Sequence, residues 1–401
     1  MYNVREVTKD VYWIGANDHR THLFENIHPI PDGVSYNAYV VLDEETVLFD
    51  TVDWGVCRPF LDNLAHVLNG RKLDYLVVNH MEPDHAASIE EVLLRYPDVT
   101  VISTEKAFYL MSQFNFHVEN KLQVKTGDTF SSGKHEYAFV EMPMVHWPEA
   151  MCTLDTTNGV LFSADAFGSF KALDGKLFAD EVNFDRDWID EARRYFTNIV
   201  GKYGPHVQAV LKVAGTLPIK ILCPLHGPIW RKDLGYILDK YDKWSSYTPE
   251  ETGVMIVYSS MYGNTEEAAQ ILASEIVKRG QTKVSVFDVS ITPVSYLISE
   301  AFRVSHIVLA STTYNLGIYP RMKDFIADMQ ALNLQNRTFG IIENGSWAPQ
   351  AGSLMREMID EMREMYYVDA EATMISSLND MTRKDVEAVA DAIVESMKKR
   401  Q

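Results

Sequence analysis

The sequence predicts an α/β fold, because segments of strand and helix character alternate along the chain and four strands end in side chains able to bind metals. Its 401 residues, 46% of them hydrophobic, are enough for two or three domains. A polar, turn-forming stretch over 247–253 follows a predicted helix over 234–244 and divides the chain. We therefore predict two domains, over residues 1–249 and 250–401.

The charge balance argues against nucleic acid and anionic membrane as partners. Lys and Arg number 37 against 56 Asp and Glu, a formal net charge of −19 that repels phosphate groups. The N-terminus lacks the apolar core of a signal peptide, and no apolar run approaches the roughly 20 residues that span a bilayer. Cys57, Cys152 and Cys223 form no close pair, which argues against a disulfide scaffold or a four-thiolate site. We expect a cytoplasmic protein.

The first candidate site follows a buried-type strand. β-Branched and aromatic residues predict strands over 11–14, 36–42 and 46–49, followed by a helix over 60–68 and a strand over 76–78. That last strand leads at once into His80, Glu82, Asp84 and His85, four potential metal ligands. Pro83 favours an extended conformation for the residue before it, and in an extended chain alternate side chains point the same way. A polar loop cap is the alternative for any one of them.

Three further strand ends repeat this arrangement. Helices are predicted over 89–95 and 106–114, with strands over 99–103 and within 122–140. His146 then follows an extended segment between prolines, Asp165 follows a strand over 159–164, and His226 follows a strand over 220–225. A structural role is the alternative for His146 alone. Together the seven groups are too many for one ion and suit two, with Asp165, which arrives from its own strand, as a bridge.

These residues resemble the metallo-β-lactamase superfamily pattern, with Glu82 where the second ligand is ordinarily a histidine. With the motifs His146-Trp147-Pro148, Asp165-Ala166-Phe167-Gly168 and His226-Gly227-Pro228-Ile229-Trp230, the chain is similar to the flavodiiron proteins, or A-type flavoproteins. The resemblance implies an N-terminal αββα sandwich with two iron ions. It implies one iron on His80, Glu82 and His146, the other on Asp84, His85 and His226, and Asp165 as the bridge. The additional carboxylate shifts preference from zinc toward iron.

The second half predicts a cofactor site at the ends of parallel strands. A strand over 254–258 leads into the loop Ser259–Thr265 and a helix over 266–279, and this loop with the helix N-terminus suits a phosphate. The loop has no Lys or Arg, which favours a monophosphate. Further strands over 283–287, 306–310 and 337–342 alternate with helices over 294–302 and 322–332. The loops after the first, third and fourth strands meet at the topological switch point of such a sheet.

This half resembles flavodoxin, which implies a doubly wound parallel sheet that binds FMN. Each aromatic side chain in the loops could alone be a packing residue, but Tyr314 and Trp347 suit stacking on a flat ring. The residues that the resemblance implies for FMN are Ser259, Ser260, Met261, Tyr262, Gly263, Asn264, Thr265, Thr312, Thr313, Tyr314, Asn315, Gly317, Asn344, Gly345, Ser346 and Trp347.

The two resemblances together imply an oxidoreductase that reduces dioxygen to water, nitric oxide to nitrous oxide, or both, with FMN feeding the two irons. Tyr195 resembles a family tyrosine that donates a hydrogen bond to the substrate; a packed helix aromatic is the alternative. A head-to-tail homodimer or dimer of dimers is implied, and a separate rubredoxin-like donor is expected because no rubredoxin domain is appended to the flavodoxin-like half at Gln401. A zinc hydrolase with a flavodoxin module and a non-enzymatic electron carrier are the competing hypotheses.

Overall fold

The computed structural model describes residues 1–400, which form two compact units. The first unit comprises Met1–Phe196 and Pro205–Tyr241, and the second comprises Thr197–Gly204 and the chain from Asp242 onward. The functional division at residues 249 and 250 stays a prediction. Within the described residues, no helix combines the length and the apolar character that crossing a membrane requires.

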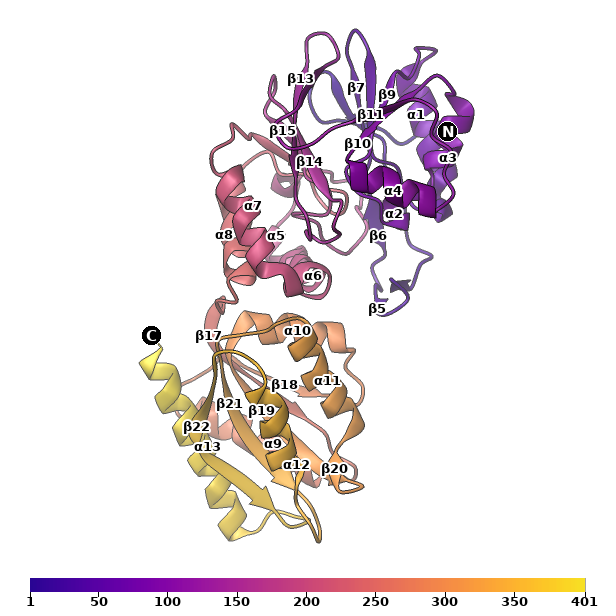
Figure 1. The fold of residues 1–401 in the computed structure, drawn as a ribbon. Coiled ribbons are helices and arrows are strands. Elements are labelled where there is room, and N and C mark those ends of the chain that lie inside the picture. Colours follow the sequence, from indigo (N-terminus) through magenta and orange to yellow (C-terminus); the bar gives the residue numbers. More distant parts are fainter. Residues whose placement is uncertain (401) are drawn as a thin grey trace. The chain divides into compact units, whose positions relative to one another are not determined.

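Two sheets form the centre of the first unit (Figure 1). Both keep most of their side chains out of water, and long apolar runs are what strands covered on both faces require. The larger sheet has the order β1 (Arg5–Glu6), β2 (Val11–Trp13), β7 (Tyr39–Leu42), β8 (Thr46–Phe49), β9 (Tyr75–Val77), β10 (Thr100–Ser103) and β11 (Lys121–Gln123). The smaller has the order β12 (Thr129–Ser131), β13 (Glu136–Glu141), β14 (Met151–Asp155), β15 (Val160–Phe162) and β16 (Ile221–Cys223).

The sheets pack face to face through one shared apolar core. Phe49 of the larger sheet stacks on Phe162 of the smaller, with ring centroids 3.8 Å apart. Helices cover the outer faces, which confirms the predicted αββα sandwich (Figure 1). Those beside the larger sheet are α1 (Cys57–Leu68), α3 (Ile89–Arg95) and α4 (Glu105–Gln113), and those beside the smaller are α5 (Phe184–Asp187), α6 (Ile189–Tyr195), α7 (Gly204–Ala214) and α8 (Leu234–Ser245).

Two local predictions for this unit are corrected by the structure. The strand predicted over 36–42 is interrupted, so that β6 (Val34–Tyr36) pairs with β3 (Ala16–Asp18) and only β7 joins the large sheet. Glu82 is extended, as Pro83 demands, but Pro83 then occupies the first turn of the helix α2 (Pro83–Ala86). Asp84 and His85 therefore leave the extended alternation and project from a helical turn. A second hairpin, β4 (Leu23–Phe24) with β5 (His28–Pro29), completes the unit.

A buried histidine at the start of β13 provides a test of this unit's stability. His135 Nδ1 lies 2.8 Å from Asp155 Oδ2, and this hydrogen bond is the main reason that the pKa of His135 is raised, with Asp43 and Asp10 adding to it. Since the folded pKa exceeds the unfolded value of about 6.5, the stabilisation is complete below that pH and is lost as pH rises through the folded pKa.

We expect His135→Gln to lower the free energy of unfolding by about 1.5–3 kcal/mol at pH 6, the contribution of a hydrogen bond to a charged group. The difference between wild type and variant should shrink as pH is raised from 6 into the alkaline range. Urea unfolding across that range, followed by tryptophan fluorescence, measures it. A difference that does not change with pH would show that His135 is not charged when paired with Asp155.

The second unit is built on a parallel sheet of five main strands. Their order is β18 (Val284–Asp288), β17 (Glu251–Tyr258), β19 (Val304–Tyr314), β21 (Arg337–Asn344) and β22 (Met365–Met374), with short β20 (Gly317–Ile318) antiparallel to β19. Numbered along the chain this is 2-1-3-4-5, the flavodoxin-like doubly wound order. The predicted fold class is confirmed. The switch point lies between β17 and β19.

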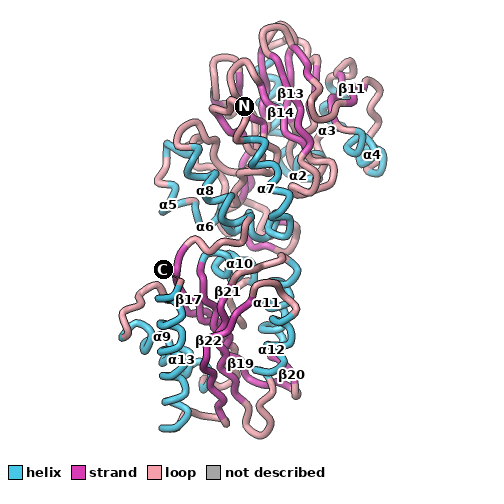
Figure 2. The backbone as a smooth tube through the Cα atoms, turned by 60° about the vertical axis from the view of Figure 1, so that its left-hand side comes forward, coloured by secondary structure: helices cyan, strands magenta, loops and turns pink. Residues whose placement is uncertain are grey.

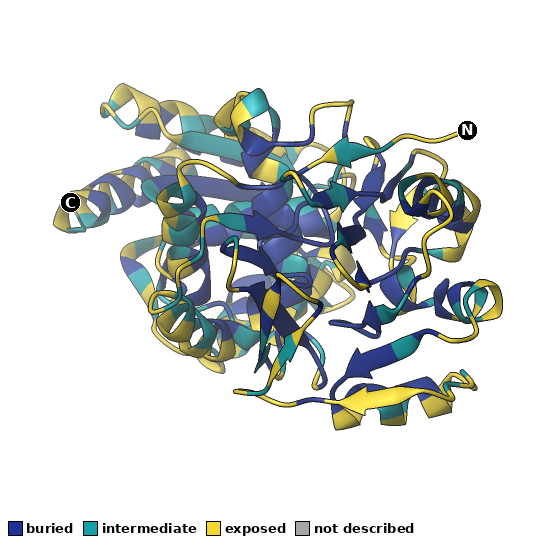
Figure 3. Ribbon diagram, turned by 90° about the horizontal axis from the view of Figure 1, so that it is seen from above, coloured by how far each residue is buried: buried dark blue, intermediate teal, exposed yellow. Residues whose placement is uncertain are grey.

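Helices cover both faces of this sheet (Figure 2). One layer holds α9 (Asn264–Lys278) and α13 (Asp380–Lys399), and the other holds α10 (Val294–Arg303), α11 (Pro320–Ala331) and α12 (Ala351–Asp360). The helices have one buried side, dark blue, and one exposed side, yellow, while most strands are buried (Figure 3). Arg337 is fully buried at the start of β21, and its guanidinium donates to backbone carbonyls that include Ala301 and Phe302, each at 2.7 Å.

Candidate metal centre and flavin cavity

The seven predicted ligands converge in the first unit as two groups of side chains. His80 and Glu82 follow β9, Asp84 and His85 lie on α2, His146 lies between β13 and β14, Asp165 follows β15, and His226 follows β16. Within each group one ligand atom of every residue lies within 4.8 Å of the others. The first group is His80, Glu82, His146 and Asp165, and the second is Asp84, His85 and His226.

Asp165 faces both groups with different oxygens. Its Oδ2 lies 3.1 Å from Nε2 of His80 and 3.1 Å from Nε2 of His146. Its Oδ1 lies 3.3 Å from Nε2 of His85 and 3.7 Å from Nε2 of His226. A carboxylate that divides its oxygens between two ligand sets in this way is suited to bridge two metal ions.

Several polar atoms of the site are buried without a hydrogen-bond partner in the described chain. They include both oxygens of Asp84 and Oδ1 of Asp165, although Asp84 Oδ2 lies only 3.2 Å from His226 Nε2. Nε2 of His85 and Nε2 of His226 also face each other at 3.0 Å. Buried polar atoms that crowd together without hydrogen bonds are costly unless a cation lies between them. The oxygen-rich donor set with four imidazoles fits two iron ions.

Hydrogen bonds to Nδ1 of two of the histidines fix Nε2 as the ring nitrogen that faces the other ligands. His226 Nδ1 lies 2.7 Å from the backbone oxygen of Ser35, which can only accept, so Nδ1 carries the proton and Nε2 keeps its lone pair. His80 Nδ1 lies 2.9 Å from the carboxylate of Glu149, so its Nε2 is likewise turned inward. Both rings are thereby oriented as metal ligands. Sequence reasoning missed Glu149, because an acidic residue in a proline-flanked loop resembles a solvated turn.

The two groups differ electrostatically in the metal-free protein. Burial opposes charge on Glu82, but hydrogen bonds from His146 and His80 hold its pKa well below the usual range. Burial also opposes charge on His146, yet Asp165 and Glu82 raise its pKa to about 9. In the second group burial dominates, raising the pKa of Asp84 to about 7 and lowering that of His226. The first group is therefore held as ion pairs, whereas Asp84 and His226 are held nearer to neutral.

Aromatic side chains enclose the second group. Phe24 and Tyr195 lie against the ring of His226, with centroids 5.5 and 5.3 Å away, and Tyr36 lies 6.2 Å from that of His85. The Tyr195 hydroxyl is fully buried and has no hydrogen-bond partner among residues 1–400. Burial, with the charge of Asp165 adding, raises its pKa well above the usual value, so it stays protonated. It is a hydrogen-bond donor without an acceptor.

Glu25 lies on the hairpin between β4 and β5 and brings another carboxyl group toward the site. Burial and the neighbouring Glu82 raise the pKa of Glu25 to about 7. Its Oε2 lies 3.7 Å from His28 Nε2, so the hairpin places an acid and an imidazole together beside the metal centre.

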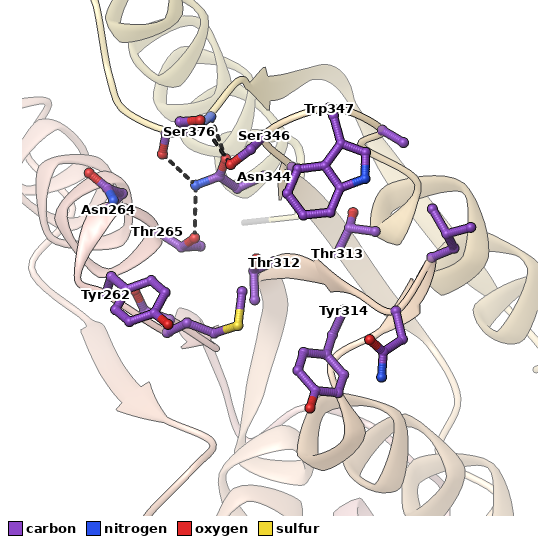
Figure 4. Close-up of a pocket in the computed structure, with 16 residues that line it drawn as sticks. Tyr262, Asn264, Thr265, Thr312, Thr313, Tyr314, Asn344, Ser346, Trp347 and Ser376 are labelled. Carbon is purple, nitrogen blue, oxygen red and sulfur yellow. Dashed lines mark hydrogen bonds between the residues drawn. The ribbon is translucent and has the colours of Figure 1, made fainter.

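A cavity of about 430 Å³ opens at the switch point of the second unit, within the size range of cofactor pockets (Figure 4). Tyr314, at the end of β19, and Trp347, in the loop after β21, border it, and Trp347 is 88% exposed. The lining comprises Ser260, Met261, Tyr262, Asn264, Thr265, Thr312, Thr313, Tyr314, Asn315, Leu316, Asn344, Gly345, Ser346, Trp347, Ala348 and Ser376.

One end of the cavity is suited to an anion. Gly263 precedes α9 with φ of 93°, a conformation that favours glycine, and no side chain caps the helix. The first N–H groups of a 15-residue helix are therefore available to a phosphate. Asn344 Nδ2 donates to Thr265 Oγ1 at 3.2 Å and to the Ser376 carbonyl at 2.9 Å, which ties the end of β21 to α9 and to the segment after β22 (Figure 4). The residues present fit a flavin mononucleotide.

The structure brings most predicted flavin residues to this cavity, but three lie outside its lining. Gly263 and Gly317 do not line it, and Ser259 is buried with its hydroxyl 3.0 Å from that of Ser311. Sequence reasoning missed Ser376, because the fifth strand was not predicted. The polar Ser376-Ser377 pair after β22 is the signal that could have located it.

Comparisons with known proteins match both halves of the chain. A family model described as the ODP family β-lactamase matches residues 34–227, and the flavodoxin model matches residues 256–363. The chain is 30% identical to the anaerobic nitric oxide reductase flavorubredoxin of Klebsiella pneumoniae, over 96% of this chain and 78% of that protein. It is 33% identical to the flavorubredoxin of the same description from Pectobacterium atrosepticum, over 85% of this chain and 68% of that one.

Solved structures resemble the chain over nearly its whole length. The rubredoxin oxygen:oxidoreductase of the anaerobe Desulfovibrio gigas superposes with a TM-score of 0.92 at 27% identity, covering 99% of both chains. A flavoprotein from Thermotoga maritima superposes with a TM-score of 0.87 at 27% identity, covering 97% of this chain and 96% of that one.

Proposed function

This chain belongs to the flavodiiron protein family and is an oxidoreductase, and we propose that it reduces nitric oxide to nitrous oxide and also accepts dioxygen. The observation that carries the proposal is Asp165, whose two oxygens face two separate ligand groups. Nitric oxide comes first because relatives at about 30% identity are named nitric oxide reductases. Dioxygen follows from the name of the D. gigas enzyme.

The proposed ligand assignment follows the two groups. His80, Glu82 and His146 would hold one iron, Asp84, His85 and His226 would hold the other, and Asp165 would bridge them. When bound, two adjacent ferrous ions can supply electrons to a small gas molecule, and FMN can return electrons to the ions. The balanced reaction combines two molecules of nitric oxide with two electrons and two protons to give one nitrous oxide and one water.

The surrounding side chains would prepare the site for that chemistry. Glu149 and the Ser35 carbonyl hold His80 and His226 with Nε2 inward. Tyr195 would donate its hydroxyl proton in a hydrogen bond to the substrate, because its raised pKa keeps it protonated and no residue among 1–400 accepts from it. Phe24 and Tyr36 limit the access of water to the second group, which strengthens electrostatic interactions there.

FMN would bind in the cavity of the second unit. Its phosphate would lie at the N-terminus of α9, beside Ser260, Asn264 and Thr265, and its ring between the loops that carry Tyr314 and Trp347. The rest of the predicted flavin set, including Ser259, Gly263 and Gly317, stays a proposal.

The proposed partners follow from the same two sites. Exposed apolar residues flank both, with Leu23 and Ile27 on the hairpin that carries Glu25 and Trp347 at the flavin cavity. These surfaces support a head-to-tail homodimer or dimer of dimers, in which one subunit's flavin serves the other's metals. A rubredoxin-like electron donor is supported by the name of the D. gigas enzyme, and we propose that it is a separate protein. The three cysteines are free and buried, in keeping with a reducing, cytoplasmic setting.

Comparing metals tests the proposed function. FMN-loaded protein would be prepared with iron and, separately, with zinc, and supplied anaerobically with nitric oxide and a chemical reductant. We expect one nitrous oxide per two nitric oxide molecules from the iron form, measured by gas chromatography, and none from the zinc form. Ester or phosphodiester hydrolysis by the zinc form, with no nitrous oxide from the iron form, would instead favour a hydrolase.

A further inference from the structure

Glu149 is a fully buried acid that contacts the metal centre only through another residue. Its side chain has no exposed surface, and its Oε1 accepts from the Met81 backbone N–H at 2.9 Å and lies 2.9 Å from His80 Nδ1. Its Oε2 has no hydrogen-bond partner among residues 1–400. A buried carboxylate with an unpartnered oxygen is costly unless positive charge lies close by. Such a charge is provided when His80 is bound to a cation.

Among residues 1–400, no carboxylate is hydrogen-bonded to the outer nitrogen of either imidazole in the second ligand group. His226 Nδ1 donates to the neutral carbonyl of Ser35, and His85 Nδ1 has no hydrogen-bond partner in the described chain. A carboxylate on the outer nitrogen of an imidazole makes the inner nitrogen a stronger donor to a metal than a carbonyl does. The two metal positions therefore differ in the hydrogen-bond acceptors behind their histidine ligands.

We infer that Glu149 is a positioning residue that makes the metal position of His80, Glu82, His146 and Asp165 the tighter of the two. This inference rests on the proposed function, because it assumes a site for two metals. Glu149 acts through His80: its charge increases the donor strength of Nε2, and its geometry fixes the ring. The other position, on Asp84, His85 and His226, binds its ion more weakly and loses it first.

The backbone around Glu149 is anchored independently of its carboxylate. Thr104 Oγ1 donates to the Glu149 carbonyl at 3.3 Å, and the Met151 N–H donates to the Asn79 carbonyl at 3.0 Å. Glu149→Gln keeps an acceptor for His80 Nδ1 and removes only the charge. The loop and its ligand His146 should therefore keep their places in this variant, which separates the effect of charge from that of folding.

Cobalt titration tests the inference without requiring turnover. Metal-free protein would be titrated with Co²⁺ alone against a competing chelator, with the visible d–d absorption reporting occupancy. Wild type should bind two ions in two steps. In Glu149→Gln the tighter step should weaken by about 10- to 100-fold while the weaker step changes less than about twofold, and Glu149→Asp, which keeps the charge, should recover part of the loss. Glu119→Gln, an exposed carboxylate in the same unit, is the matched control.

The His226→Ala variant shows which of the two cobalt-binding steps belongs to which metal position. His226→Ala should remove the weaker step and leave the tighter one, and adding Glu149→Gln to it should weaken the step that remains. The inference is overturned if Glu149→Gln leaves both steps unchanged, or weakens both equally as a general structural defect would. Wild-type protein that binds fewer than two Co²⁺ ions would instead overturn the proposed two-metal site itself, so the two failures are distinguishable.

Discussion

Replacing Asp165 with alanine is expected to abolish gas reduction while leaving the flavin bound. Asp165 supplies an oxygen to each of the two ligand groups, so its removal leaves four histidines with only Glu82 and Asp84 as anions. Bound iron should fall from two ions per chain to one or none. Nitrous oxide production should fall by at least about 10²- to 10³-fold, the loss that follows removal of one preorganised charge-stabilising group.

The measurements for this variant are iron content, FMN content and nitrous oxide yield on the same preparation. FMN content should be unchanged, because the cavity is built from residues 260–376 of the other unit. Asp174→Ala is the control, since Asp174 is an exposed residue of the first unit that pairs with the exposed Lys176. Full activity in Asp165→Ala with two bound irons would contradict the bridging role.

Exchanging Glu82 for histidine should change which metal the site selects. The Glu82 carboxylate lies 2.9 Å from His146 Nε2 and 3.3 Å from His80 Nε2, so a ring at this position would give the first ion a third imidazole. Fewer oxygen donors favour zinc and stabilise the ferric state less. We expect the zinc-to-iron ratio of protein grown in the presence of both metals to rise, and nitrous oxide production to fall by at least about 100-fold.

Glu90→His controls for the added imidazole, because Glu90 is exposed on α3 in the same unit. Metal ratios come from elemental analysis and flavin content from absorbance after release. FMN should stay at the wild-type level in both variants. A Glu82→His protein that keeps its iron and reduces nitric oxide at the wild-type rate would show that Glu82 does not set the metal preference.

Helices and strands were predictable where the apolar residues follow a regular spacing. They were less predictable where contacts with distant residues determine the local conformation. The predicted helix over 89–95 matches α3, and the strand over 46–49 matches β8, because their apolar spacing is continuous. The stretch 36–42 was predicted as one strand, but Asn37 breaks it by donating to the carbonyls of Pro224 and Gly227. Partners almost two hundred residues away along the chain are not visible in a local pattern.

In the site, too, the residues that follow local patterns were predicted and those that depend on distant contacts were not. All seven metal-binding candidates follow predicted strands, so that their convergence could be inferred from sheet topology alone. Glu149 and Ser376 were missed, because their roles depend on His80 and Asn344, which approach them only after folding. The helical turn at Pro83 was also missed, although proline commonly occupies the first turn of a helix. Residues that act through another residue are the least visible in sequence.

The most direct test of the central claim is the oxidation of the flavin by nitric oxide. Protein with two irons and one FMN per chain, fully reduced under argon, would be mixed in a stopped-flow instrument with nitric oxide and, separately, with dioxygen. The flavin absorbance should return to the oxidised form with nitric oxide, and Asp165→Ala should remain reduced on the same timescale. Iron-replete wild-type protein whose flavin stays reduced with both gases would contradict the account.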